Sequence, residues 1–147
     1  MIADLSFRSA TESDVSEIAR IEALSFKTPW STEMISSEMR EPLSHFTVAE
    51  VENTVVGYFG YLHILDELHI LNVAVDPLHR GCGVGKEMME RLLLEARALS
   101  VRAITLEVRE SNRSAIRLYE RVGFKLAGIR PHYYTDKENA LIYWLEL

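Results

Sequence analysis

A short glycine-rich stretch is the clearest place in this sequence where residue types and spacing could bind a ligand. Residues 79–86 read HRGCGVGK, with glycine at alternate positions. An apolar run typical of a buried strand precedes the stretch, and a run with helical periodicity follows it. Backbone N–H groups at a helix start are unpaired and the helix dipole is positive there, so such a loop can bind an anion. Arg80 and Lys86 add positive charge, which favours a phosphate or pyrophosphate.

Two common nucleotide-binding patterns do not fit this loop. A Walker loop needs a glycine where Arg80 stands and Ser or Thr where Glu87 stands. The dinucleotide pattern GxGxxG needs a glycine at Lys86 or Met88. The pattern that remains is R-x-x-G-x-G, beginning at Arg80. Taken alone, it is also compatible with a glycine-rich loop that only closes a tight strand-to-helix turn.

Length and composition limit the class of protein. The chain has 147 residues, 48% of them hydrophobic and 26% charged, so we expect one globular domain over 1–147. A net charge of −6 argues against nucleic acid as a partner, because that binding needs clustered Lys and Arg. Cys82 is the sole cysteine, so no intrachain disulfide can form. No apolar run is long enough to cross a membrane, and the first residues do not resemble a signal peptide, so we expect no membrane partner and a cytoplasmic location.

Turn residues and hydrophobic periodicity divide the chain into alternating strands and helices. We expect strands at 5–8, 45–50, 55–64, 69–75, 103–108, 125–133 and 139–146. We expect helices at 15–26, 31–39, 83–99 and 114–122. Thr11 and Asp14 are typical of a helix start, and Gly123 of a helix end. This order predicts an α/β (α+β) fold with one sheet covered by helices.

Three further segments, one before the glycine loop and two after it, narrow the families that the loop pattern resembles. The strand NVAV at 72–75 leads into Asp76-Pro77, LEVRESN follows at 106–112, and AIRLYERVGF at 115–124. Together with R-x-x-G-x-G, they resemble the GNAT superfamily of acetyl-CoA-dependent N-acetyltransferases over nearly the whole chain. The resemblance implies a central mixed, mostly antiparallel sheet of about seven strands with helices on both faces. It also implies a bulge in the fourth strand, and a splayed acetyl-CoA cleft between the fourth and fifth strands.

A narrower resemblance concerns the acceptor. Pro29-Trp30-Ser31, the segment LDE at 65–67, LEVRESN and Tyr133-Tyr134 resemble the bacterial alanine N-terminal acetyltransferases of ribosomal proteins. This implies a protein or peptide N-terminus as partner, an N-terminal alanine of a small-subunit ribosomal protein. The turn TDKENA at 135–140 is shorter than the family's turn. Because that turn borders the acceptor site, the identity of the acceptor stays open.

The resemblance also assigns the cosubstrate and the reaction. It implies acetyl-CoA, with no metal, bound by Val73, Ala74, Val75, Arg80, Gly81, Cys82, Gly83, Val84, Gly85, Lys86, Asn112 and Tyr119. It implies direct acetyl transfer to the amine, with Glu107 as general base and Tyr119 as general acid. The alternatives are an exposed strand-edge glutamate at Glu107 and a core tyrosine at Tyr119. For Asn112 the alternative is the N-cap of the helix at 114–122, and both roles are compatible.

The acid strength of Glu107 bears on the acceptor. An ordinary glutamate, with a pKa of about 4.3, is a weak base for an ammonium group, so we expect a raised pKa or a relaying water. An α-amino group, with a pKa of about 7.7–8.0, loses its proton far more easily than a lysine at about 10.4. A weak base therefore favours an N-terminal acceptor over a lysine side chain.

Aromatic residues are the acceptor-site candidates. We expect Phe26, Pro29, Trp30, Tyr133 and Tyr134 to contact the first residues of a peptide, with packing around the first two helices as the alternative. A nucleophilic role for Cys82 is disfavoured, and the histidines have no metal-ligand spacing. Two other functions stay open at this point: acetylation of a small-molecule amine, and a non-catalytic CoA-binding regulatory module.

Overall fold

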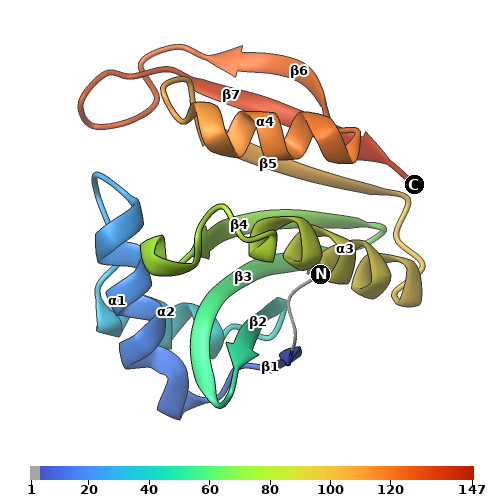
Figure 1. Cartoon of the computed structure of the whole chain (residues 1–147). Coiled ribbons are helices and arrows are strands. Elements are labelled where there is room, and N and C mark those ends of the chain that lie inside the picture. The colour runs from blue at the N-terminus through green and yellow to red at the C-terminus, as the bar shows by residue number, and fades with distance from the viewer. Residues whose placement is uncertain (1–3) are drawn as a thin grey trace.

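A central sheet with helices on both faces organises the chain (Figure 1). The structure is a computed structural model and describes residues 4–147. Within these residues the sheet has seven strands in the order β1-β2-β3-β4-β5-β7-β6. The strands are β1 (Leu5–Ser9), β2 (Ser44–Val51), β3 (Thr54–Ile64), β4 (Glu67–Val75), β5 (Ala103–Arg109), β6 (Lys125–Arg130) and β7 (Ala140–Glu146). The α-helices are α1 (Val15–Ser25), α2 (Thr32–Met39), α3 (Val84–Ala98) and α4 (Arg113–Val122). The predicted fold class is confirmed.

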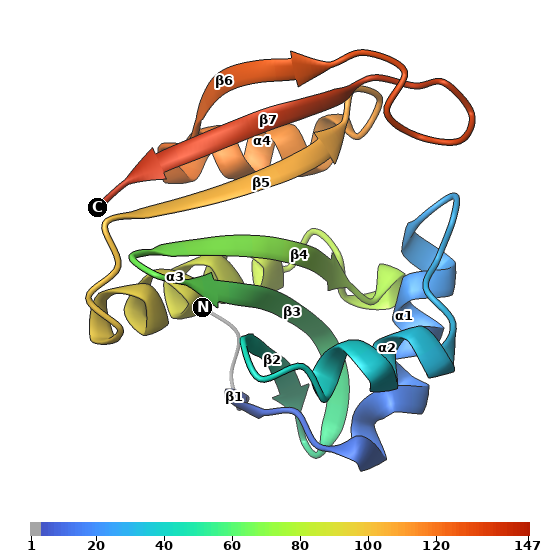
Figure 2. The same cartoon turned by 180° about the vertical axis from the view of Figure 1, so that it is seen from behind.

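The sheet opens between β4 and β5. Among residues 4–147 this is the one parallel pair, and its paired residues are 67–69 against 103–105. Beyond these residues the two strands diverge, and both views show β4 and β5 moving apart toward their C-terminal ends (Figures 1 and 2). The predicted splay between the fourth and fifth strands is confirmed.

A bulge interrupts β4 beside this opening. In the register with β3, Gly60 pairs with Asn72 and Tyr61 pairs with Ile70, so Leu71 is an extra residue. A bulge of this kind disrupts the local ladder and re-aims the residues around it. The bulge expected in the fourth strand is therefore present, and it lies where β4 leaves β5.

Two hydrophobic clusters hold the helices against the sheet. On one face, Met88 and Leu92 of α3 pack in a cluster with Phe59 and Ile104. On the other face, α1 and α2 contribute to a second cluster of buried residues. Its members include Ile18, Ile21, Ile35, Val48 and Tyr58. The apolar stripes that predicted the helices are thus the stripes that the helices bury.

Several boundaries differ from the sequence expectation. The third helix begins at Val84 rather than Gly83, because Gly83 is the N-cap with a φ of 89°. The sixth strand ends at Arg130 rather than Tyr133, because Pro131 has no N–H for the ladder and His132 has a φ of 54°. Within the described residues 4–147, no helix has both the length and the apolar character that crossing a membrane requires.

Candidate active site

Two adjoining cavities lie where β4 and β5 diverge. The first, the acceptor-side cavity, has a volume of about 330 Å³ and is lined by residues from α1, β4, β5 and the segment before β7. The second, the loop-side cavity, has a volume of about 270 Å³ and lies beside the glycine loop. Both are lined by Phe26, Val73, Asn112 and Tyr119. The cavities therefore meet at the opening of the sheet.

The loop-side cavity combines a strand edge with a helix start. Val73–Val75 of β4 line it, together with Arg80, Gly81 and Gly85. No side chain caps the start of α3, and a Cβ on Gly81 or Gly83 would meet no atom within 4 Å. Free helix N–H groups beside open space suit an anionic ligand. The Arg80 guanidinium crosses the base of the loop, donating to the Val75 carbonyl at 3.1 Å and the Ser25 hydroxyl at 3.0 Å.

Four other residues expected to bind the cosubstrate do not line this cavity. Cys82 and Lys86 are exposed, and Gly83 is the exposed N-cap of α3. The Val84 side chain is buried in the core beneath the loop. The exposed part of the loop therefore offers the backbone N–H groups of the helix start together with the Lys86 ammonium group.

Tyr119 forms part of the wall between the two cavities. It is 6% exposed, and burial raises the pKa of its hydroxyl above the ordinary 10.0, so the hydroxyl is protonated at neutral pH. Among residues 4–147, the hydroxyl makes no hydrogen bond, although its ring packs at 5.8 Å from that of Phe124. Tyr119 is thus a buried tyrosine whose proton is free for a ligand in either cavity.

Glu107 lines the acceptor-side cavity from β5. Its side chain is 33% exposed, and its carboxylate forms an ion pair with Arg130 of β6. Arg130 reaches across β7, which lies between the two strands in the sheet. The sequence did not indicate this partner, because the pairing depends on the strand order β5-β7-β6.

Asn112 has the structural role that the sequence left open and also lies at the site. Its side-chain oxygen accepts from the Ala115 N–H at 3.3 Å as the N-cap of α4. The same side chain lines both cavities. The cap fixes the direction in which Asn112 faces the ligand space.

Most of the predicted aromatic wall is present. Phe26, Trp30, Tyr133 and Tyr134 line the acceptor-side cavity, whereas Pro29 is exposed and does not. The rings of Tyr133 and Tyr134 pack edge to face with centroids 5.1 Å apart. Four of the five aromatic and proline candidates are thus brought together, from two segments more than 100 residues apart in sequence.

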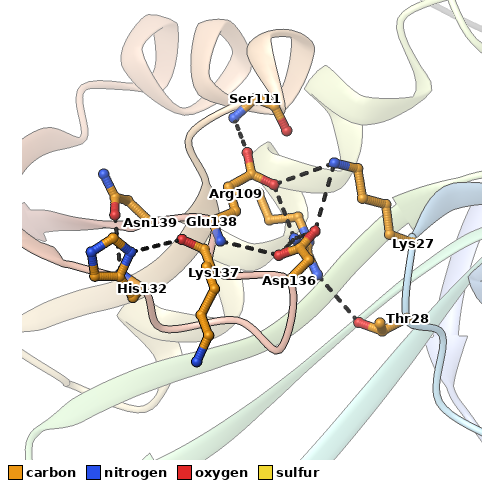
Figure 3. A network of polar contacts seen from close by, with 9 residues as sticks. All are labelled: Lys27, Thr28, Arg109, Ser111, His132, Asp136, Lys137, Glu138 and Asn139. Carbon is orange, nitrogen blue, oxygen red and sulfur yellow. Dashed lines mark hydrogen bonds and ion pairs between the residues drawn. The ribbon is translucent and has the colours of Figure 1, made fainter.

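A polar network holds the segment that carries these tyrosines (Figure 3). Arg109 of β5 donates to Glu138 at 2.9 Å and to Asp136 at 3.0 Å, and stacks over the Tyr134 ring at 4.0 Å. Lys27, in the turn after α1, lies 3.5 Å from Glu138. The network therefore ties the segment between β6 and β7 to both sides of the cavity.

This network predicts an acid-dependent contribution to stability. Hydrogen bonds from Ser111 and Arg109 hold the pKa of Glu138 at about 2, below its ordinary 4.5. A lowered folded-state pKa stabilises the fold above the ordinary value, and the stabilisation is lost as the pH falls from about 4.5 toward about 2. We expect Glu138→Gln to lower the free energy of unfolding at pH 7, with a difference from wild type that shrinks below pH 4.5. Urea unfolding at pH 7, 5, 4 and 3 measures it.

Glu90→Gln, at an exposed position on α3, is the matched control and should differ little from wild type at any of these pH values. A Glu138→Gln difference that stays constant with pH would show that the charge of Glu138 contributes nothing.

Two charged residues that line the acceptor-side cavity, Glu22 and Arg109, were not among the site residues that the sequence predicted. Glu22 is the more deeply buried of the two. Glu22 is 1% exposed and accepts hydrogen bonds from the Trp30 N–H at 2.9 Å, the Asn72 amide at 2.6 Å and the Tyr58 hydroxyl. The sequence does contain a signal for a buried Glu22, because this residue follows Ile18 by four residues and so lies in the apolar stripe of the first helix.

Comparison with known proteins agrees with this arrangement. The acetyltransferase (GNAT) family model matches residues 15–124. The ribosomal protein bS18-alanine N-acetyltransferase of Escherichia coli is 36% identical over 133 residues, covering 88% of this chain and 88% of that protein. The crystal structure of the ribosomal-protein-S18-alanine N-acetyltransferase from E. coli has a TM-score of 0.89 at 32% identity, covering 97% of this chain and 93% of the other. Ard1 from Thermoplasma volcanium has a TM-score of 0.93 at 30% identity, with 99% of both chains covered.

Proposed function

Because this chain belongs to the GNAT acetyltransferase family and is an N-acetyltransferase, we propose that it acetylates the N-terminal α-amino group of a protein. The acceptor we propose is an N-terminal alanine of a small-subunit ribosomal protein, in the cytoplasm. The observation that carries the proposal is the pair of adjoining cavities: one beside an anion-binding loop, the other walled by aromatic residues, with Tyr119 between them. The names of the E. coli relatives support the choice of acceptor.

GNAT acetyltransferases take their acetyl group from acetyl-CoA, whose thioester supplies an activated carbonyl. The loop-side cavity fits this molecule, since it joins free helix N–H groups to the edge of a diverging strand. We assign the pyrophosphate to the loop 80–86 and the pantetheine arm to Val73–Val75 and Asn112. Arg80 contributes from the base of the loop, where it holds the Val75 carbonyl.

In the reaction we propose, the acceptor nitrogen attacks the thioester carbonyl carbon. A C–N bond forms and the C–S bond breaks. Glu107 takes the proton that the amine loses, directly or through a water. Tyr119 gives its proton to the leaving thiolate, and a backbone N–H of the strand 72–75 polarises the carbonyl. These roles account for the position of the Glu107 carboxylate and the protonated Tyr119 hydroxyl on the same cavity.

The acceptor-side cavity suits the start of a peptide. Its aromatic members present flat apolar faces, and the segment that carries Tyr133 and Tyr134 is fixed by the network around Arg109. A flexible chain end can enter such a cavity with its amine first. A free α-amino group, with a pKa of about 7.7–8.0, also needs less help to lose its proton than a lysine.

A comparison of acceptors tests the proposal. The enzyme is incubated with acetyl-CoA and a peptide that begins with alanine and contains one lysine, and free-thiol release and the acetylated position are measured. We expect release, with the acetyl group on the N-terminal nitrogen. Spermidine and the same peptide with a blocked N-terminus are the parallel arms. Release with spermidine alone would overturn the peptide acceptor, and no release with any amine would overturn the catalytic roles.

A further inference from the structure

The charges around the acceptor-side cavity do not balance. Three ionisable acidic or basic side chains, Glu22, Glu107 and Arg109, line it among residues 4–147. Glu107 forms an ion pair with Arg130. Arg109 forms ion pairs with Asp136 and Glu138. Glu22 forms no ion pair within the described part of the chain. The cavity therefore holds one carboxyl group, that of Glu22, without a positive partner in the described part of the chain.

The partners of Glu22 in residues 4–147 are all neutral. They are a backbone N–H at Trp30, a side-chain amide at Asn72 and a hydroxyl at Tyr58. Burying a carboxylate costs several kcal/mol unless a cation or strong hydrogen bonds offset the lost hydration. The three hydrogen bonds offset part of that cost, and no cation within residues 4–147 offsets the rest. A positively charged ligand group would supply the missing counter-charge.

We propose that Glu22 is the group that binds the positively charged α-amino group of the acceptor. This inference rests on the proposed function and adds to it a substrate-binding residue. The ammonium group supplies the cation that Glu22 lacks. No covalent step is involved, since the contact forms before the amine gives up its proton.

The surroundings of Glu22 place this charge where an amine has to arrive. Trp30 belongs to the aromatic wall of the cavity, and Asn72 lies beside the bulge of β4. Glu22 contacts both, so its carboxylate lies between the acceptor wall and the strand assigned to the acetyl donor. Burial also raises the pKa of Glu22, and a nearby cation would favour its charged form.

The test compares two peptides that differ only in the amine. One begins with alanine; in the other a propionyl group replaces that alanine, which removes the amine and keeps the carbon skeleton. Binding to the enzyme saturated with CoA is measured by calorimetry. We expect wild type to bind the alanyl peptide about tenfold more tightly, which corresponds to about 1.4 kcal/mol. We expect Glu22→Gln to bind the two peptides equally, and Glu22→Asp to regain part of the preference.

A purely structural role gives a different pattern. Glu22→Gln would then weaken both peptides by the same factor and leave the preference intact, which would overturn the proposal. Asp14→Asn is the matched control, because Asp14 is also a buried acid of this region but is paired with Arg8 outside the cavity. We expect Asp14→Asn to lose thermal stability and keep the peptide preference.

The same measurements decide the proposal if the variant does not fold, and they distinguish its failure from the failure of the proposed function. If Glu22→Gln does not fold, wild type decides: an alanyl preference below about twofold overturns the proposal. Wild-type turnover of the alanyl peptide is measured alongside. If wild type acetylates the peptide while Glu22→Gln keeps the preference, the Glu22 proposal alone fails. If wild type does not acetylate it, the proposed function fails and the Glu22 proposal falls with it.

Discussion

Glu107→Gln lowers kcat/KM for a peptide with an N-terminal alanine by about 10²- to 10⁴-fold, the range typical of a lost general base. The loss is greatest at low pH. There the acceptor is mostly an ammonium ion, with a pKa of about 7.7–8.0, and something must take its proton before the nitrogen can attack. At high pH the amine is already neutral and the variant approaches wild type. A pH profile of kcat/KM from pH 6 to 9.5 measures the effect.

The ion pair between Glu107 and Arg130 makes a matched control necessary. Glu107→Gln removes both the base and the pair, whereas Arg130→Gln removes the pair and keeps the carboxylate. We expect Arg130→Gln to retain activity within about tenfold, with a pH profile of wild-type shape. Equal losses in the two variants would assign the effect to the pair. A Glu107→Gln profile of unchanged shape would remove Glu107 as the base.

The parts of the site that the sequence predicted are local in the chain. The glycine loop, the strand before it and the helix after it are consecutive, so R-x-x-G-x-G at residue 80 and NVAV at residue 72 suffice to place them. The N-cap role of Asn112 is equally local, because cap and capped N–H are three residues apart. Short-range patterns of this kind can be read without knowledge of the fold.

The parts that were missed depend on pairing between distant segments. The ion pair of Glu107 with Arg130 requires the strand order β5-β7-β6, and the contacts of Arg109 with Glu138 require the path of the segment before β7. Glu22 meets Asn72 only because α1 packs beside the bulge of β4. Strand order and the packing of α1 on the sheet decide these contacts, and the hydrophobic periodicity of one segment does not specify which distant segment it will meet.

The opening of the sheet explains why these distant residues converge. β4 and β5 pair only over residues 67–69 and 103–105, so the remaining residues of the two strands form no hydrogen-bonded ladder with each other. Side chains from α1, the two diverging strands and α4 line the space that a backbone ladder would otherwise occupy. A cavity at this position therefore follows from the topology, and its chemistry from the few polar residues that face it.

Tyr119→Phe lowers kcat by about 10²-fold or more while the KM for acetyl-CoA changes little, because the variant removes a proton donor and keeps the ring. The hydroxyl makes no hydrogen bond within residues 4–147, so thermal stability should be unaffected. Steady-state kinetics and calorimetric CoA binding separate the two effects. The matched control is Tyr143→Phe, because Tyr143 is a buried tyrosine that lines neither cavity. Its hydroxyl donates a hydrogen bond to Glu120 at 3.0 Å. That variant should lose stability and keep kcat. If Tyr119→Phe instead weakens only CoA binding, Tyr119 is a packing residue and the thiolate takes its proton from another source.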